Sequence, residues 1–417
     1  MKRQLAVLAI LGLMLGGCGG QPKPIPLEIT EPIPLEITEP EPTGEASAEA
    51  SYAQVPQARY TALWFEEEHR EMFDAETNTV KVLDFACAWP HALLSGSPEA
   101  SKKITLRLFE ETSAFVKGSS QEGSVFNTPG LEQSAARARE NYTMLGEIFA
   151  PSAVERTYEI TGGNSRLLSV CARDYLYMGG AHGSSVEKYL VFDTETGELL
   201  TFGDMTDGPN GLWAIVVEKM QQIAKTDPDI SARMDFVEED QIYSAVAALV
   251  REGSWYIQDD CLCFASAEYE MGSYAAGIIR FRIPMEELRE HIKPRYLPEH
   301  RTPGQVSLAE KTDLLSVDLL QVGDGRDSFY LEARDSVAKL RLFTLEPYAD
   351  GQTVHEGTSL WSGMDLENCA LSVTAELSET VPGLGLEYDT GDGILHRCII
   401  SRSREDGSLT LSELPEF

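Results

Sequence analysis

His182 is the first candidate for a catalytic residue in this 417-residue chain, because its neighbours in the sequence could support a reaction. Ser184 and Ser185 follow it and Asp174 precedes it, so a nucleophile, a base and an orienting acid occur within one short stretch. A catalytic triad, however, is defined by geometry and not by adjacency in the sequence. A histidine that ends a Gly-Gly turn more often hydrogen-bonds the backbone of that turn, and we expect this role for His182.

Glu268 and Glu270 are a second candidate, because paired carboxylates can act as acid and base on a glycosidic bond. They lie at the end of a strand that we expect over Cys261–Tyr269, and strand residues two apart share a face. A solvated sheet face explains the pair equally well. The sequence supplies no third feature that argues for glycoside hydrolysis.

Other catalytic motifs are absent from the sequence. It contains no Gly-x-Ser-x-Gly elbow and no His-Glu-x-x-His helix. Asp259 and Asp260 form its only Asp-Asp pair, and no His-x-x-x-His occurs to complete a metal site with them. A turn at the entry of a strand explains this pair better. We therefore expect a protein that is not an enzyme and that holds neither a metal nor another cofactor.

The residues around His182 predict a β-meander. Alternating apolar and polar residues lead to Tyr177, a glycine-rich corner follows, and a second alternating run spans Val186–Phe192. The composition of Asp193–Gly197 predicts a turn that sends the chain back once more. The glycines of the corner permit positive φ angles, which are costly for other residues.

The segment beyond the meander predicts two helices and a second corner. Apolar residues recur with helical spacing from Leu212 to Ile223, and another helix is expected from Glu239 to Arg251. A corner over Glu270–Gly277 then joins two strands. We expect an α+β fold in this central region, with antiparallel sheets packed against helices. Structural roles are expected for four corner glycines: Gly179, Gly180, Gly183 and Gly277.

The two corners carry a family resemblance. The chain reads Tyr-x-Gly-Gly-Ala-His at the first corner, Glu-Tyr-Glu-x-x-x-Tyr-Ala-x-Gly at the second, and Ile-Pro-x-x-Glu-Leu after the last strand. In order and spacing these motifs resemble the RsiV-like extracellular domain, over residues 151–300. The resemblance implies a binding module that captures lysozyme, a strongly basic enzyme. We expect ligand contacts from residues of the two corners: Tyr177, His182, Glu268, Glu270 and Tyr274.

Residues 59–150 form the preceding folded segment. A strand over Lys81–Trp89 is expected to end at Pro90, and Pro98 lies in the first turn of an expected helix. This order resembles the PdaC-like domain that often precedes the RsiV-like one. Some PdaC-like proteins carry a deacetylase domain, but its metal-binding motif is missing from this sequence, so we do not expect deacetylase activity.

The N-terminal residues predict export and lipidation. Residues 1–17 have the basic start and the short apolar run of a signal peptide. Cys18 follows Leu-Gly-Gly and resembles the lipidated cysteine of a bacterial lipobox, which implies a lipid anchor at the extracytoplasmic face of the cell membrane. Residues 18–58, rich in proline and glutamate, predict a disordered tether.

Six cysteines remain beyond Cys18, and two states are open for them. An oxidising location permits disulfides, whereas buried free thiols are an equally good alternative. The spacing suggests neither a zinc site nor a redox motif. The six are Cys87, Cys171, Cys261, Cys263, Cys369 and Cys398.

Residues 303–417 predict a small all-β, sandwich-like domain, because short alternating runs are separated by Gly, Asp and Pro turns. The whole chain has 67 acidic and 34 basic residues, a net charge of −33. This charge argues against nucleic acid as a partner and would attract a cationic protein, although it also simply favours solubility.

Three functions remain open from the sequence. The leading hypothesis is a membrane-anchored binding module for a lysozyme-like cationic protein or for peptidoglycan. The first alternative is a cell-wall carbohydrate-active enzyme that uses His182 or the Glu268 and Glu270 pair. The second is a structural envelope protein without a soluble ligand.

Overall fold

The computed structural model describes residues 58–120, 124–236, 238–299, 302–322, 325–347, 354–377, 383–391, 394–403 and 405–413. The described residues belong to one compact unit, Gln57–Phe417, by their internal contacts. The signal peptide, Cys18 and nearly all of the expected tether lie outside the described residues and stay predictions. Of the described helices, none combines the length and apolar composition needed to cross a membrane.

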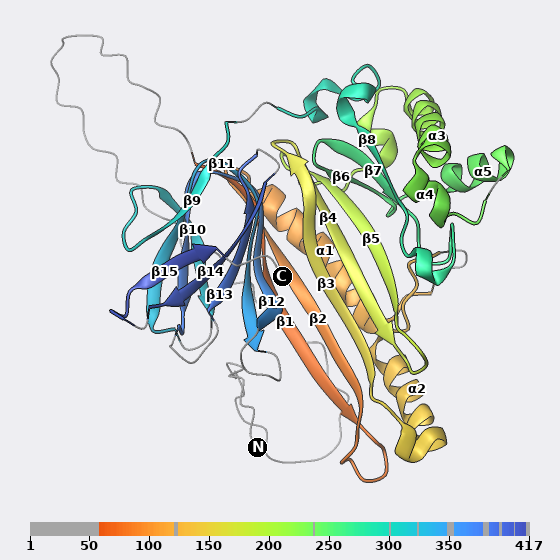
Figure 1. The fold of residues 1–417 in the computed structure, drawn as a ribbon, viewed down its shortest axis with the longest axis horizontal. Helices are drawn as coiled ribbons and strands as arrows, with labels where there is room; N and C mark the ends of the chain where they lie inside the picture. Colours follow the sequence, from red (N-terminus) through yellow and green to blue (C-terminus); the bar gives the residue numbers. More distant parts are fainter. Residues whose placement is uncertain are drawn as a thin grey trace. The chain divides into compact units, whose positions relative to one another are not determined.

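Twelve strands within the described residues join one sheet. They are β1 (Arg59–Phe73), β2 (Lys81–Leu94), β3 (Ser152–Asn164), β4 (Leu167–Tyr177), β5 (Ser184–Asp193), β9 (Gln305–Ala309), β10 (Leu315–Val322), β11 (Asp327–Pro347), β12 (Val354–Ala375), β13 (Leu384–Asp389), β14 (Leu395–Arg402) and β15 (Leu409–Glu413). Their order is β15-β14-β13-β11-β12-β1-β2-β3-β4-β5, with β10 beside β12 and β9 beside β11 (Figure 1). Neighbours are antiparallel except for the pairs β2–β3 and β10–β12.

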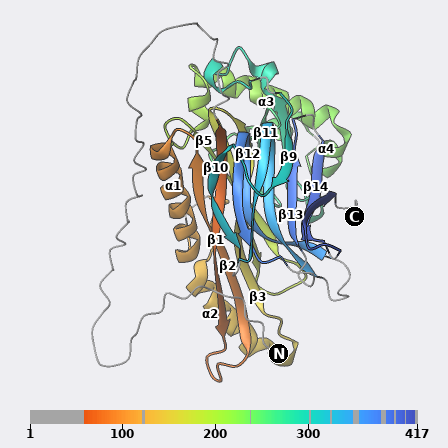
Figure 2. The same cartoon turned by 90° about the vertical axis from the view of Figure 1, so that its left-hand side faces the viewer.

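Two helices cover one face of the N-terminal strands. They are α1 (Pro98–Lys117) and α2 (Gly130–Leu145), which pack on β2, and Figure 2 shows α1 beside the sheet. The proline at the first position of α1 supplies a helical φ angle where no hydrogen-bond donor is needed. Ile104, Leu108 and Phe115 recur with helical spacing and are buried, which confirms the predicted helix.

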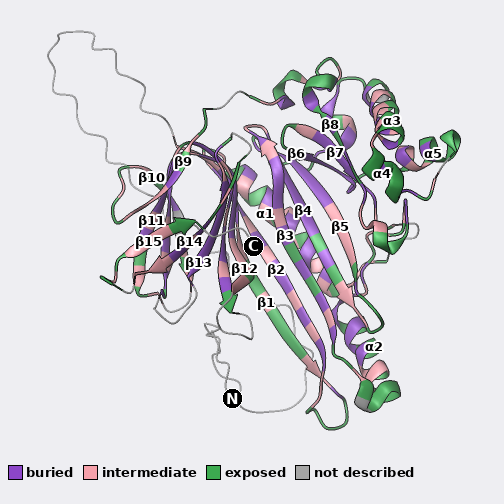
Figure 3. Ribbon diagram, in the orientation of Figure 1, coloured by how far each residue is buried: buried purple, intermediate pink, exposed green. Residues whose placement is uncertain are grey.

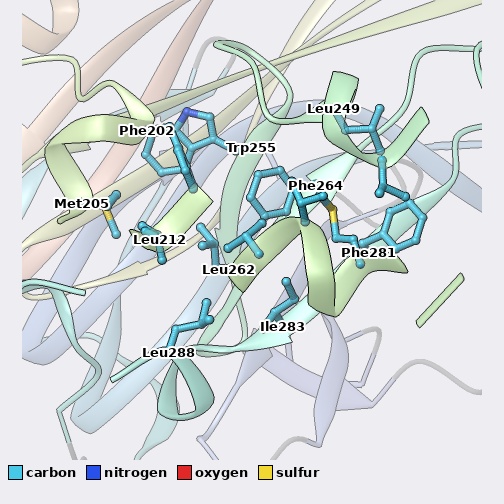
Figure 4. Packing of buried hydrophobic residues seen from close by; sticks show 14 of the residues in the cluster. Phe202, Met205, Leu212, Leu249, Trp255, Leu262, Phe264, Phe281, Ile283 and Leu288 are labelled. Carbon is cyan, nitrogen blue, oxygen red and sulfur yellow. The ribbon is translucent and has the colours of Figure 1, made fainter. Parts of the chain in front are cut away.

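A second sheet has three strands, β6 (Trp255–Gln258), β7 (Cys261–Ala265) and β8 (Arg280–Pro284). Three helices accompany it: α3 (Pro209–Thr226), α4 (Pro228–Arg233) and α5 (Glu239–Leu249). Apolar residues of α3, α5 and all three strands form one core cluster, and Figure 4 labels Phe264 and Phe281 among its packed rings. The helices predicted from apolar spacing are confirmed, whereas α4 was not predicted.

β4 lies between the two layers and is buried on both faces. Leu168 and Val170 belong to the core cluster that includes α1, while Cys171 packs with Tyr256 of β6. The hydroxyl of Ser169 accepts a hydrogen bond from the backbone N–H of Ile257 at 3.1 Å. Figure 3 shows the resulting run of buried residues along β4, in contrast to the exposed α4. The first sheet is therefore fixed from both sides in this region.

β11 and β12 each change partners along their length. β12 pairs with β1 up to Glu367 and with β10 from Cys369 onward. The change coincides with a register shift against β11 and with left-handed φ angles of 58° at Asp335 and 50° at Asn368. The strands on either side of this bend share one apolar core, so the all-β, sandwich-like C-terminal region is confirmed. The predicted α+β class is confirmed as well.

The strand ending predicted at Pro90 is wrong. β2 continues to Leu94, and Pro90 lies opposite Phe65 of β1. Pairing between β2 and β3 stops at Cys87, so Pro90 has a partner strand on one side only. A missing N–H is tolerated where no second ladder must be completed.

The expected folded segments 59–150, 151–300 and 303–417 share the large sheet. β2 of the first pairs with β3 of the second, and β12 of the third pairs with β1 of the first. Their boundaries as separate domains stay predictions, but the strands on either side of each boundary are held in one structure.

All six described cysteines are free thiols, and all but Cys261 are buried. Of the two alternatives that the sequence left open, disulfides and free thiols, the structure has free thiols. Burial raises the pKa of Cys87, Cys263 and Cys369 to about 12. Such thiols stay protonated near neutral pH and react slowly.

Candidate functional site

Two parts of the chain, residues 175–183 from the end of β4 to the start of β5 and residues 266–279 between β7 and β8, meet at one point; we call them the double corner. The rings of His182 and Tyr274 stack with centroids 3.7 Å apart and planes 17° from parallel. The carbonyl oxygen of Gly183 accepts hydrogen bonds from the Tyr274 hydroxyl at 3.3 Å and from His182 Nδ1 at 2.9 Å. The predicted backbone role of His182 is confirmed, and it also joins the two corners.

The double corner exposes aromatic rings. Tyr269 is 60% exposed, Tyr175 39% and Tyr274 38%, and the rings of Tyr269 and Tyr274 lie 5.7 Å apart. A Cβ atom at Gly183 would lie 2.5 Å from the Tyr175 ring, so Tyr175 packs directly on this glycine. Exposed large apolar side chains gathered in one place are uncommon on monomers and mark interaction surfaces.

The backbone of the double corner requires glycine at several positions. Gly179, Gly180 and Gly277 have φ angles of 93°, 107° and 62°, in the left-handed region that other residues rarely adopt. The Tyr177 hydroxyl donates to the carbonyl oxygen of Gly180 at 3.2 Å and closes the first corner. The structural role predicted for these glycines agrees with this geometry, and Tyr177 is a brace of the turn.

Two arginines brace the second corner. Arg233 of α4 donates from Nε to the carbonyl oxygen of Ala276 at 2.9 Å and from Nη2 to that of Ile278 at 2.9 Å. Arg251, just after α5, holds both carboxylate oxygens of Glu270 at 2.5 and 2.8 Å. The exposed tyrosines therefore stand on turns that neighbouring helices hold in place, which limits the entropy lost on binding.

Glu268 and Glu270 do not form the arrangement that the sequence suggested. The strand predicted over Cys261–Tyr269 ends at Ala265, and both glutamates lie in the following turn. They therefore share no strand face, and the strand prediction is wrong at this end. Tyr269 between them has a left-handed φ of 64°, which rotates the chain out of the β conformation. Glu270 is occupied by Arg251, and Glu268 has one buried carboxylate oxygen without a hydrogen-bond partner.

Asp174 is not an orienting acid for His182. Its two carboxylate oxygens accept from Nε and Nη2 of Arg156 at 2.5 and 2.6 Å, and both side chains are buried. Burial opposes the charge of Arg156, but the hydrogen bonds and charge of Asp174 raise the pKa of this guanidinium above its usual value. The structure thus assigns Asp174 to a buried ion pair. In the part of the chain that the structure describes, no three His, Cys, Asp or Glu side chains are grouped so that they could hold a metal ion.

Several residues of the double corner, and the two arginines that brace it, were not predicted as site residues. Tyr175 lies two residues before Tyr177 on the same strand, so the alternation of side chains could have found it. Tyr269 lies between the two predicted glutamates and is 60% exposed. Arg233 and Arg251 gave no local signal, because their partners lie on other elements.

One segment of this region is similar to a known protein family. Residues 202–286 match the family described as "Protein of unknown function (DUF3298)". This segment includes the second corner and lies within the 151–300 range of the predicted RsiV-like domain. No curated protein matches the chain.

Two solved structures are similar to the chain at low identity. One is the crystal structure of a DUF3298 family member from Bacteroides fragilis, at 14% identity and a TM-score of 0.39, covering 55% of this chain and 93% of that chain. The other is a DUF3298 family protein from Pseudomonas aeruginosa PAO1, at 14% identity and a TM-score of 0.35, covering 58% of this chain and 97% of that chain.

Proposed function

We propose that this chain is a lipid-anchored binding module at the extracytoplasmic face of the cell membrane, and that the double corner captures a cationic partner protein. The observation that carries the proposal is the group of exposed rings at the double corner, formed by Tyr175, Tyr269, Tyr274 and His182. Tyrosines on rigid turns provide large contact areas at low cost in side-chain entropy, and they are frequent hot spots of protein interfaces.

The chemistry of the double corner favours binding over catalysis. The Nδ1 atom of His182 is engaged by a backbone carbonyl, and Glu270 is engaged by Arg251. Glu270 would have to leave this partner in order to act as an acid or a base, and the hydrogen bond at Nδ1 holds the His182 ring in its stack on Tyr274.

The net charge supports a cationic partner. At −33, the chain attracts a basic protein over distances of about a Debye length, ~8 Å at physiological salt. The resemblance to the RsiV-like extracellular domain implies lysozyme, which fits this charge. Association is expected to slow as the salt concentration rises, whereas dissociation depends less on salt because contacts at the centre of an interface are desolvated.

Surface plasmon resonance with the purified chain and lysozyme across a salt series tests the proposal. We expect Tyr274→Ala to raise the Kd at least tenfold, which corresponds to ~1.4 kcal/mol. Tyr243→Ala is the matched control, because Tyr243 is 44% exposed on α5 and is not part of the double corner. Absence of binding at low salt would reject lysozyme as the partner. Equal effects of the two substitutions would reject the double corner as the binding site. Binding to peptidoglycan instead would identify a wall polymer as the ligand.

The anchor has its own test. Replacing Cys18 with alanine should release the chain into the medium or leave it unprocessed, because no lipid can then be attached. A Cys18→Ala chain that remains on the membrane at its mature size would contradict the proposed lipidation.

A further inference from the structure

A cavity of about 500 Å³ lies between α1, β5 and the residues that lead into β6; we call it the junction cavity. Its wall includes Arg107, Glu111, Phe115, Arg156 and Lys188 on one side and Phe126, Arg251, Glu252 and Trp255 on the other. Each of its four cations has a carboxylate partner: Arg107 pairs with Glu110 and Glu111, Lys188 with Glu111, Arg156 with Asp174, and Arg251 with Glu270. The charges of the cavity wall are therefore balanced within the protein. Because Glu270 belongs to the second corner, this wall helps to hold the double corner in place.

The end of α2 carries three exposed apolar side chains. Met144 is 68% exposed, Leu145 43% and Ile148 81%, and we call these three residues the α2 tip. Thirteen large apolar side chains are exposed in the described part of the chain; three belong to the α2 tip and three are the tyrosines of the double corner. Single exposed apolar side chains are common on soluble proteins, whereas groups of them mark interaction surfaces.

The α2 tip is exposed because the helix extends beyond the core on which it packs. Leu131, Ala135 and Ala138 recur with helical spacing and are buried in one core cluster. Leu145 continues this spacing but is 43% exposed, so no described element covers it fully. Gly146 then ends α2 with a left-handed φ of 56°, which turns the chain away from the helix.

The α2 tip lies beside the glycine-rich turn of the double corner, residues 178–183. Asn141 of α2 donates from Nδ2 to the carbonyl oxygen of Met178 at 2.8 Å. The α2 tip begins three residues after Asn141, so its first two members lie on the same side of the helix, one turn further on. At the other end of the turn His182 stacks on Tyr274, and residues 179–182 between these two contacts are exposed. The exposed surface therefore continues from the α2 tip to the tyrosines.

The double corner alone is small for a protein interface. A standard interface buries about 800 Å² on each partner. Full burial of an aromatic side chain removes ~150–250 Å² from water, and the three tyrosines are only 38–60% exposed. They supply roughly half of the required area at most. A stable complex therefore needs further contact surface next to them.

The charge at the end of α2 suits a cationic partner. The C-terminal end of a helix carries a partial negative charge, which basic residues in the last turn commonly offset. The last turn of α2 contains no basic residue. A basic side chain of a partner would be stabilised beside the apolar contact, in keeping with the net charge of −33.

We propose that the α2 tip is a second contact surface for the cationic protein that the double corner captures. This inference rests on the proposed function and extends it. The partner spans the glycine-rich turn, with the tyrosines on one side of it and the α2 tip on the other. Such a partner presents an apolar patch bordered by basic side chains.

Surface plasmon resonance with the purified chain and lysozyme tests the proposal. Met144→Ser and, separately, Ile148→Ser remove apolar contact from exposed positions, where substitutions affect folding little. We expect each to weaken binding at least threefold through faster dissociation, the usual effect of losing an interface contact. Leu315→Ser is the control, because Leu315 is 61% exposed on β10, which lies beside β12, and β1, β2 and β3 separate β12 from β4. Thermal unfolding identifies a variant that fails to fold, in which case the other variant decides.

Tyr274→Ala distinguishes this inference from the proposed function. If Tyr274→Ala weakens binding while both tip variants bind as tightly as Leu315→Ser, the double corner stands and the α2 tip is rejected. If the wild-type chain does not bind lysozyme, both are rejected. In the Tyr274→Ala background we expect Ile148→Ser to weaken binding by the same factor as in wild type, because separate contacts add in free energy. Loss of its effect in that background would mean that the α2 tip only supports the corner, which would overturn the proposal.

Sedimentation velocity tests a second copy of the chain as the occupant of the α2 tip. We expect the wild-type chain and Ile148→Ser to sediment with the same mass. A wild-type dimer that Ile148→Ser dissociates would assign the α2 tip to contact between two copies and would overturn the proposal.

Discussion

The double corner and the junction cavity use aromatic rings and charges in opposite ways. At the double corner the rings are exposed, and the arginines stand behind them as braces on backbone carbonyls and on Glu270. In the junction cavity Phe115 is 1% exposed, and the charges of Arg156 and Asp174 are buried together. The comparison indicates that removing one ring or charge from the cavity wall costs folding free energy, whereas removing one ring from the double corner costs binding.

Truncating a ring in each region should give the largest contrast. Phe115→Ala removes a buried ring that packs on Phe85 and carries Arg156, so we expect the free energy of unfolding to fall by ~3–5 kcal/mol. Tyr269→Ala removes a ring that is 60% exposed, and the expected change is within ~0.5 kcal/mol. Urea denaturation of both variants measures the difference. Similar losses in the two variants would break the contrast.

The buried ion pair should come next. Asp174→Ala leaves the Arg156 guanidinium buried without its carboxylate, although the Glu111 carbonyl still accepts from it. We expect a loss of ~3 kcal/mol in the free energy of unfolding. Adding Arg156→Met to Asp174→Ala should recover much of this loss, because the unpaired charge is then removed.

An exposed ion pair is the control for this experiment. Lys103 and Glu198 are 51% and 65% exposed, so Glu198→Ala should cost no more than ~1 kcal/mol. If Glu198→Ala and Asp174→Ala were equally destabilising, burial would not be what distinguishes the cavity wall.

A smaller effect is expected from the backbone of the double corner. Gly180 has a φ of 107° and no atom within 4 Å of a Cβ position, so Gly180→Ala should cost ~1 kcal/mol through backbone strain alone, and valine more. Gly211 lies within α3 without a positive φ, so Gly211→Ala should stabilise by ~0.5–1 kcal/mol. Thermal unfolding of the two alanine variants should therefore show shifts of opposite sign. A stable Gly180→Ala chain that has lost only binding would make this glycine part of the contact surface.

The local sequence predicted the turns but not the distant residues that the turns contact. The positive φ angles at Gly179 and Gly180 follow from residues that adjoin each other in the chain. The hydrogen bond from Tyr274 to Gly183 spans 91 residues, and that from Lys188 to Glu111 spans 77. No periodicity encodes such contacts, because they depend on how whole strands and helices pack. The double corner could therefore be predicted in part, while the junction cavity could not be predicted at all.

The C-terminal strands illustrate the same limit at the level of the fold. Alternation of apolar and polar residues predicted an all-β region, which is confirmed. The pairing of β12 with β1 joins Trp361 to Trp64, and nothing near either residue indicates it. The secondary structure could thus be predicted from short-range patterns in the sequence. The order of the strands in the sheet could not, because it depends on pairing between residues far apart in the chain.

The smallest effect concerns His91, a half-buried histidine that stacks on an aromatic ring, as the exposed His182 also does. The His91 ring lies 3.9 Å from that of Trp64 and meets the edge of Phe109 at 4.9 Å. Burial lowers the pKa of His91, and the charge of Glu66 beside it opposes this shift only in part. Between the lowered pKa and the usual value of ~6.5, the unfolded chain binds more protons than the folded one.

The contribution of His91 to stability is therefore complete above about pH 6.5 and is lost as the pH falls through and below that value. His91→Gln removes the titrating group, so the drop in melting temperature between pH 8 and pH 5 should be smaller in the variant than in the wild-type chain. Differential scanning calorimetry at matched ionic strength measures both drops, and the carboxylates that titrate at lower pH cancel in the comparison. An equal or larger drop in His91→Gln would mean that the stack on Trp64 does not favour the neutral ring, and that the partial burial of this histidine has no pH-dependent consequence for stability.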